Sequence, residues 1–291
     1  MMRFEQKKSE KYQQEFTEGM HHLTTSLEGE RKRESQRLHI IKTGEGNPDA
    51  CKRGLSSQAL ANSLVSWFRD KDLMECKRWA YVSAKLERIE LQESYELILG
   101  SPMVSNLFAA WTWLVSDCAE MIEWRRQFEP FGNFTGEEPR PKEITKSDCD
   151  RIYAGYQLTF ALRGEWDRLG ERAERWLANP PPSIQKVTPD MRFFLALAKG
   201  NIAEMEEQLR EITSPKQRRW RWDWQDPYSY RLISDEAVVY AKLAWMHGYQ
   251  VDVDTPYIPK EWLPISPIAK YEEPKHWEFS RAFDINQPLP T

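Results

Sequence analysis

The stretch LALAKGNIAEMEEQLREI, residues 195–212, decides the fold class. An apolar helical segment ends at Gly200, and a second apolar stripe follows at the spacing of one helix face. The side-chain oxygen of Asn201 can accept a hydrogen bond from a free backbone N–H, with Glu204 as the capping-box partner three residues later. The stretch therefore predicts two helices joined by a tight turn at Gly200.

The same pattern occurs upstream, and its ending recurs downstream. FALRG, residues 160–164, precedes a second amphipathic stretch at 166–178, and LAWMHG, residues 243–248, ends a third helix after a longer interval. Prolines at 180–182 and 215 close the pairs because proline cannot continue a helix. Helical hairpins recurring near 36 residues are typical of helical repeat arrays. We therefore expect an all-α protein, a helical hairpin array or irregular bundle, tetratricopeptide-like in the middle.

Helices are also expected in the N-terminal half. Residues 3–27 are highly charged with weak helical periodicity, and residues 28–56 contain Gly, Pro and mixed charges that favour a loop or irregular connector. The helical spacing of apolar residues begins at Leu60, continues through 72–99 and is clearest at 104–128.

Prolines and glycines suggest where the chain divides. Residues 129–146 hold three prolines and two glycines, which indicates an internal boundary. We expect residues 1–56 to form an N-terminal extension and residues 57–291 to form a helical domain. An extended, proline-punctuated segment closes the chain after Gly248.

The composition indicates a packed core and disfavours nucleic acid as a partner. Hydrophobic residues make up 40% and aromatic residues 12%, with 13 Trp, whereas disordered chains are poor in aromatics. The net charge is −4, so the chain lacks the basic footprint usual for nucleic-acid binders. A cationic protein partner fits this charge better.

Motifs that carry catalysis or hold cofactors are missing from the sequence. The four cysteines are widely spaced. No HExxH metal motif, phosphate-binding loop, dinucleotide fingerprint or nucleophile elbow occurs. The acidic pairs Asp148/Asp150 and Asp252/Asp254 have no base or further metal ligand nearby in the sequence. We therefore expect buried thiols, no metal, no cofactor and no catalytic residues. The N-terminus has no apolar signal region and no run of about 20 apolar residues occurs, so a cytoplasmic protein without membrane contact is expected.

The most unusual stretch is KQRRWRWDWQDPYSY, residues 216–230. In an extended backbone, Trp220, Trp222 and Trp224 would share one face. Three interpretations are open: a strap whose indoles fill a groove between helices, a protein-binding surface rich in hot-spot residues, or a platform for stacking single-stranded nucleic acid.

The C-terminal third resembles a known family. SDEA, residues 234–237, opens a helix ending at Gly248, and VDVDTPYIPKEWLP, residues 251–264, follows with Pro267, Tyr271 and WEF at 277–279. This pattern resembles the immunity protein 49 family of bacterial polymorphic toxin systems. The resemblance is best over residues 228–280 and extends, more weakly, from about residue 105.

The resemblance implies an all-helical, non-catalytic protein that neutralises a toxin encoded beside it by tight binding. Such toxins pass between competing bacteria, often by contact-dependent or type VI secretion, and many are nucleases. Dimers are common among such proteins, so the resemblance also allows a homodimer besides the complex with the toxin. The alternatives are a tetratricopeptide-like adaptor or chaperone, and an enzyme with an unrecognised helical site. The residues expected to bind the toxin are Trp220, Trp222, Trp224 and Tyr228 as anchors, and Asp223, Asp226, Glu120 and Glu123 as charge partners.

Overall fold

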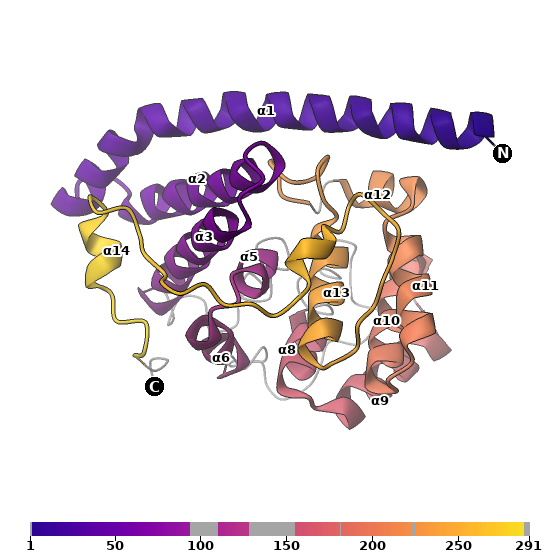
Figure 1. Cartoon of the computed structure of the whole chain (residues 1–291). Helices are drawn as coiled ribbons and strands as arrows, with labels where there is room; N and C mark the ends of the chain where they lie inside the picture. Colours follow the sequence, from indigo (N-terminus) through magenta and orange to yellow (C-terminus); the bar gives the residue numbers. More distant parts are fainter. Residues whose placement is uncertain (1, 94–109, 128–154, 181, 223–224, 288–291) are drawn as a thin grey trace.

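The fold is all-helical, as the sequence predicts. The computed structural model describes residues 2–93, 110–127, 155–180, 182–222 and 225–287. These ranges contain twelve α-helices, two 3₁₀ helices and no strand (Figure 1). The predicted boundary at 129–146 lies outside them.

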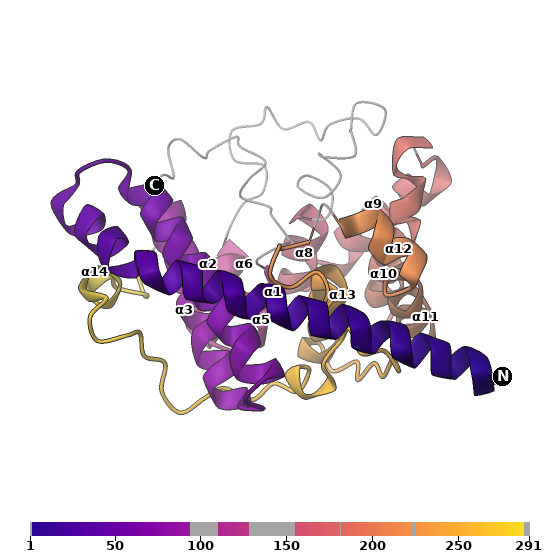
Figure 2. The ribbon, with the colours of Figure 1, turned by 90° about the horizontal axis from the view of Figure 1, so that it is seen from above.

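The N-terminal layer consists of α1 (Met2–Thr43), α2 (Pro48–Phe68) and α3 (Leu73–Glu93). The long helix α1 runs along the whole length of the molecule, past α2 and α3 at one end and α11 and α12 at the other (Figures 1 and 2). Leu23 and Leu27 of α1 are buried one turn apart, and Arg31 donates to the Asn62 side chain of α2 at 2.7 Å. This helix therefore packs against parts of the chain that are far apart in the sequence.

The expectation of a loop or connector over 28–56 is wrong. The helix α1 continues to Thr43, because its polar residues are good helix formers and its apolar residues face α2. Only residues 44–47 separate the two helices. Gly44 and Gly46 take positive φ there, and Asn47 caps α2 by accepting from the N–H of Ala50 at 2.9 Å. The glycines and the Asn-Pro pair therefore mark helix ends and not a long loop.

The expected single helix over 104–128 is interrupted. Within the described residues it forms α5 (Ala110–Val115) and α6 (Ala119–Gln127). The break lies at Asp117, which has a φ of 56°, in the left-handed region that non-glycine residues seldom occupy. Contacts of its buried carboxylate with Lys77 and Lys242 offset the cost of this backbone conformation.

The two helical hairpins of the middle region are confirmed. They are α8 (Gly155–Arg163) with α9 (Trp166–Ala178), and α10 (Thr188–Ala198) with α11 (Ile202–Ile212). Gly164 and Gly200 have positive φ at the two turns, and Asn201 accepts from the N–H of Glu204 at 3.2 Å to cap α11. Gly248 also has positive φ, but an extended segment follows it in place of a partner helix.

The predicted extended conformation of 216–230 is wrong where the structure describes it. After η4 (Pro182–Val187) and the second hairpin, α12 spans Pro215–Arg221. Ser214 caps this helix through the N–H of Gln217 at 3.3 Å, and Pro215 is its first residue. The alternating tryptophans suggested a strand, but the local Ser-Pro start signal determined the structure.

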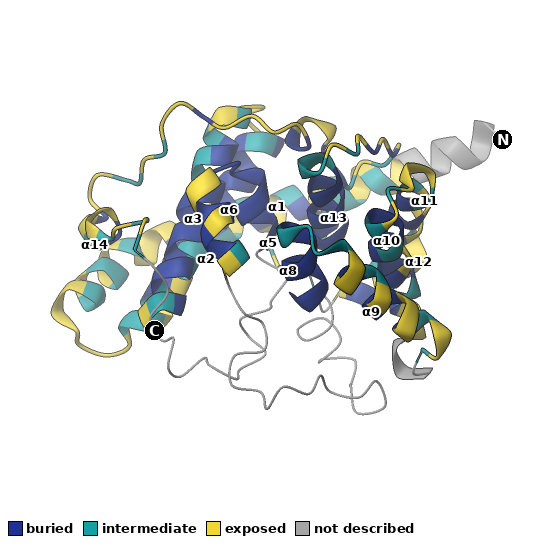
Figure 3. Cartoon of the chain, turned by 90° about the horizontal axis from the view of Figure 1, so that it is seen from below, coloured by how far each residue is buried: buried dark blue, intermediate teal, exposed yellow. Residues whose placement is uncertain are grey.

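The centre of the molecule is α13 (Asp235–Met246), whose first ten residues are all buried. Figure 3 shows α8 and α13 covered on nearly all sides, while α9 exposes its outer face. The C-terminal strap, residues 249–287, then crosses the bundle to the α2 and α3 end (Figure 1). It contains η6 (Lys260–Trp262) and α14 (Glu278–Ala282), and its Trp262 ring stacks on Trp111 at 5.3 Å between centroids.

Candidate partner-binding site

A buried ion cluster joins the N-terminal layer, α13 and the strap. The Asp117 carboxylate contacts the Lys77 ammonium of α3 and the Lys242 ammonium of α13, each at 2.7 Å. Lys242 also donates to the carbonyls of Trp262, Leu263 and Pro264, and Asp117 accepts from the backbone N–H of Ser266 at 3.1 Å. These contacts fix the position of α6 relative to the strap.

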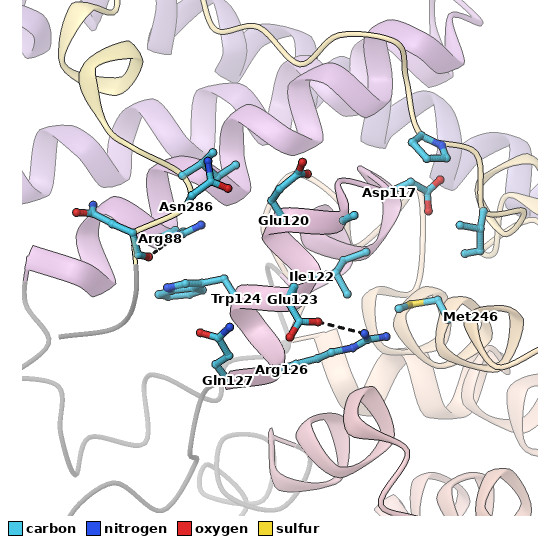
Figure 4. A pocket seen from close by; sticks show the side chains of 15 residues that line it. Arg88, Asp117, Glu120, Ile122, Glu123, Trp124, Arg126, Gln127, Met246 and Asn286 are labelled. Atoms are coloured by element: carbon cyan, nitrogen blue, oxygen red, sulfur yellow. Dashed lines mark hydrogen bonds and ion pairs between the residues drawn. The ribbon is translucent and has the colours of Figure 1, made fainter. Parts of the chain in front are cut away.

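A groove of about 730 Å³ opens between α6 and the strap. Figure 4 shows Trp124 and Arg88 at one end, and Asp117 with Met246 at the other. Both Glu120 and Glu123, which the sequence suggests as charge partners, are exposed and line this groove. We call these two residues the acidic rim. The structure therefore brings this pair of predicted residues together.

Arg88 closes one end of the α6 groove. The residue is 1% exposed, and its guanidinium lies 4.8 Å from the Trp124 ring centroid and donates to the Gln287 carbonyl at 2.7 Å. Burial lowers the pKa of Arg88 to about 10, against the attraction of Asp284. The Arg88 side chain therefore connects the end of the strap to α3 and α6.

The predicted tryptophan anchors lie on or just after α12. Trp222 is 66% exposed, whereas Trp220 is half-buried. At about 100° per residue, two positions apart on a helix correspond to about 200°, so these rings lie on different sides of α12 and not on one shared face. Trp224 and Asp223 lie outside the described residues.

A buried ion pair fixes α12 on the bundle. Arg221, which is 1% exposed, makes two hydrogen bonds to Asp190 at the start of α10, at 2.9 and 2.5 Å. The hydroxyl of Tyr240 from α13 donates to the same carboxylate at 2.8 Å. The Asp190 charge raises the pKa of Arg221 against the effect of burial. The exposed face of α12 therefore rests on a rigid base.

A second groove, of about 600 Å³, lies beside α12 and is called the α12 groove. Four cations from η4, α10, α11 and α12 line it together with Trp220: Lys186, Arg192, Arg210 and Lys216. The Lys186 ammonium lies 5.4 Å from the Trp220 ring centroid. Glu207 and Glu211 line the α11 side. The sequence pattern gives no sign of Lys186 or Arg192 as site residues, because they reach Trp220 only through the folding of the second hairpin.

Asp226 and Tyr228 contact the interior of the fold. The Asp226 carboxylate accepts from the N–H of Tyr228 at 2.8 Å, and its own N–H donates to Asp235 at 2.9 Å. Burial raises the pKa of Asp226 to about 6. The half-buried Tyr228 ring stacks on His22 of α1, with 6.3 Å between centroids. The structure therefore places Tyr228 against α1 and Asp226 beside the start of α13, whereas Trp222 faces solvent.

The described thiols and acidic groups show no arrangement typical of a metal centre. Burial raises the pKa of Cys76 and of Cys118 to about 12, which disfavours the nucleophilic thiolate. Cys51 is half-buried, and Cys149 lies outside the described residues. Among the described side chains, no three His, Cys, Asp or Glu residues are placed to hold a metal ion. None of the described helices is long and apolar enough to span a membrane.

Part of the chain matches a protein-family model. The family model described as Immunity protein 49 matches residues 163–262, about a third of the chain. No curated protein and no solved structure matches. The matched range begins upstream of the 228–280 segment in which the resemblance was best, and it includes the second hairpin, α12 and α13. From the end of α8 to the end of η6, residues 163–262 of the chain therefore match the model of an immunity protein 49 domain.

Proposed function

We propose that this protein neutralises a cognate antibacterial toxin by binding it directly and tightly. The observation that carries the proposal is the immunity protein 49 match over residues 163–262. That range contains Trp222, which at 66% is the most exposed large hydrophobic residue of the described chain. A large aromatic side chain held open to water directly after a firmly anchored helix is typical of a protein-binding surface.

The affinity needed explains why such anchors are required. An inhibitor of a lethal toxin must dissociate slowly, and nanomolar binding corresponds to about −12 kcal/mol. A few buried aromatic or arginine residues supply most of the free energy in such interfaces. Trp222 supplies an aromatic surface that the partner can cover, and the Arg221–Asp190 pair holds its helix in place before binding. A preorganised anchor loses little conformational entropy on association.

The acidic rim supports a partner with a cationic surface. Glu120 and Glu123 are exposed on one edge of the α6 groove, and the net charge of the chain is −4. Carboxylates in this arrangement can face the lysines and arginines that hold nucleic acid in a nuclease. The proposed toxin is therefore a nuclease or another effector that acts in the cytoplasm, where this protein would meet it.

The proposal is tested by genetics with the gene adjacent to the one encoding this chain. Deleting the present gene should prevent growth, and deleting the neighbouring toxin gene as well should restore it. Co-expression in a sensitive host should restore growth and give a stable one-to-one complex. A harmless neighbour, or a lethal one that this chain neither binds nor relieves, would contradict the proposal and favour a peptide-binding adaptor.

A further inference from the structure

The charges around α12 are opposite in sign to those of the acidic rim. Lys186, Arg192 and Lys216 are exposed and line the α12 groove, and Arg219 is exposed on the outer face of α12. In the part of the chain that the structure describes, no carboxylate lies within ion-pair distance of these four cations. The surface beside Trp220 is therefore cationic.

Other exposed cations of the same domain are paired. The ammonium of Lys199 lies 2.7 Å from the Glu174 carboxylate, and the guanidinium of Arg210 lies 3.0 Å from the Glu206 carboxylate. Carboxylates are thus available on these helices, yet Lys186 and Lys216 are left without one among the described residues. Like charges gathered around one groove repel each other, so an acidic ligand would relieve that repulsion.

The geometry of the groove suits a peptide segment. Lys216 and Trp220 are one turn apart on α12, and Lys186 reaches over the Trp220 ring from η4. An apolar ring flanked by ammonium groups can contact the stem of a side chain while the cations contact its carboxylate. Trp222 directly follows α12, on a different side from Trp220, and does not line this groove.

We infer that the α12 groove binds an acidic segment of the toxin, with Lys186 and Lys216 facing its carboxylates. The inference rests on the proposed function and adds the chemistry of the partner at this surface. It requires a toxin with carboxylates opposite α12 and cations opposite the acidic rim. Two contacts of opposite sign would fix the orientation of the complex, because a reversed partner would place like charges together.

Charge complementarity favours a protein over a nucleic acid in this groove. Glu207 and Glu211 line the α11 side, and they would repel a phosphate backbone that carries a charge at every nucleotide. A folded protein can place carboxylates opposite Lys216 and Lys186 and hydrogen-bond donors opposite Glu207. The net charge of −4 adds to the repulsion of a nucleic acid.

The test is a binding titration with the purified toxin encoded by the adjacent gene. The double variant Lys186→Glu/Lys216→Glu should raise Kd about tenfold or more, mainly by slowing association, and its Kd should depend less on salt. The matched control Lys32→Glu/Lys275→Glu makes the same change in net charge at exposed positions of α1 and the strap, and should leave Kd nearly unchanged. Circular dichroism and Tm should show that both variants fold.

The outcomes separate the inference from the proposed function. If the unmodified chain fails to bind the toxin, the proposed function is wrong. If it binds and the Lys186/Lys216 variant binds equally well, only the inference is wrong. A zero-length carbodiimide should couple Lys186 or Lys216 to toxin carboxylates, and complete absence of such cross-links would also contradict the inference. Tight binding of a thymidine oligonucleotide, lost in the double variant, would assign the groove to nucleic acid and overturn it.

Discussion

The ammonium of Lys242 lies 2.7 Å from the carboxylate of Asp117, and neither side chain has any exposed surface. Lys77 contacts the same carboxylate, so one buried anion is shared by two buried cations. Burial lowers the pKa of Lys242 to about 8, and Asp117 opposes that shift. The cluster links α3, α13 and the strap, and therefore joins the N-terminal layer to the region that matches the immunity protein 49 model.

Replacing Asp117 by asparagine should destabilise the protein strongly. Asparagine tolerates the left-handed backbone at this position, so the change isolates the lost charge. Two buried lysines would remain without a counter-ion, and breaking a buried ion pair in this way costs about 3–5 kcal/mol. The free energy of unfolding in urea measures the effect. The control Glu174→Gln breaks the exposed Lys199 pair and should cost less than about 1 kcal/mol; equal losses in the two variants would refute the role of Asp117.

Two glycines of α1 should respond in opposite directions to alanine. A methyl group on Gly19 would lie 2.9 Å from Cβ of Arg231 and 3.1 Å from a methyl carbon of Leu232, so the helix would have to move away. We expect Gly19→Ala to lower the free energy of unfolding by about 1 kcal/mol or more. At Gly29 the nearest side-chain atom is 4.0 Å away, and alanine should stabilise the helix by up to about 1 kcal/mol. Stabilisation by both substitutions would show that α1 does not pack closely on residues 231–232.

Stability should depend on the charge of Asp226. Burial raises the pKa of this carboxyl from its ordinary value of 3.8 to about 6, so the folded state binds the proton more tightly than the unfolded state. The stability that the protonated Asp226 carboxyl contributes is therefore fully present below about pH 4 and is lost as the pH rises through 6. Asp226→Asn should gain stability relative to the unmodified chain between pH 4 and pH 7.

Urea unfolding at several pH values measures this dependence. Asp254→Asn, at an exposed position of the strap, controls for the loss of one negative charge. If the stability difference between Asp226→Asn and the unmodified chain is the same at pH 4 and pH 7, the pKa of Asp226 is not raised by burial.

Trp222→Ala should separate binding from folding. The side chain is 66% exposed, so its loss should change the free energy of unfolding by no more than about 0.5 kcal/mol. As a hot spot it should cost at least about 2 kcal/mol of toxin binding, roughly a 30-fold rise in Kd. Met74→Ala removes another exposed hydrophobic side chain, on α3, and should not affect binding. Unchanged affinity in Trp222→Ala would remove this residue from the interface.

Local signals in the sequence predict the two helical hairpins correctly, because the turn of each hairpin depends only on residues that are neighbours in the sequence. Gly164 and Gly200 supply the positive φ that ends a helix, and Asn201 caps the next helix through a residue three positions along. The start of α12 is also marked by Ser214 and Pro215, but the alternating tryptophans that follow favour an extended strand when they are considered by themselves.

Features that depend on distant residues could not be predicted in this way. The break at Asp117 requires Lys77 and Lys242, which come from helices on either side of it in the sequence. The length of α1 depends on packing against α2 and the 228–231 region more than on its own weak periodicity. The α12 groove joins Lys186 to Trp220 only after the second hairpin has folded.

The most direct test of toxin neutralisation is the growth of a sensitive bacterium that expresses the adjacent toxin together with this chain. We predict full growth with the unmodified chain, recovery of a one-to-one complex, and reduced protection by Trp222→Ala at equal protein levels. Cell death in the presence of abundant, folded protein, with no complex recovered, would contradict toxin neutralisation by this chain.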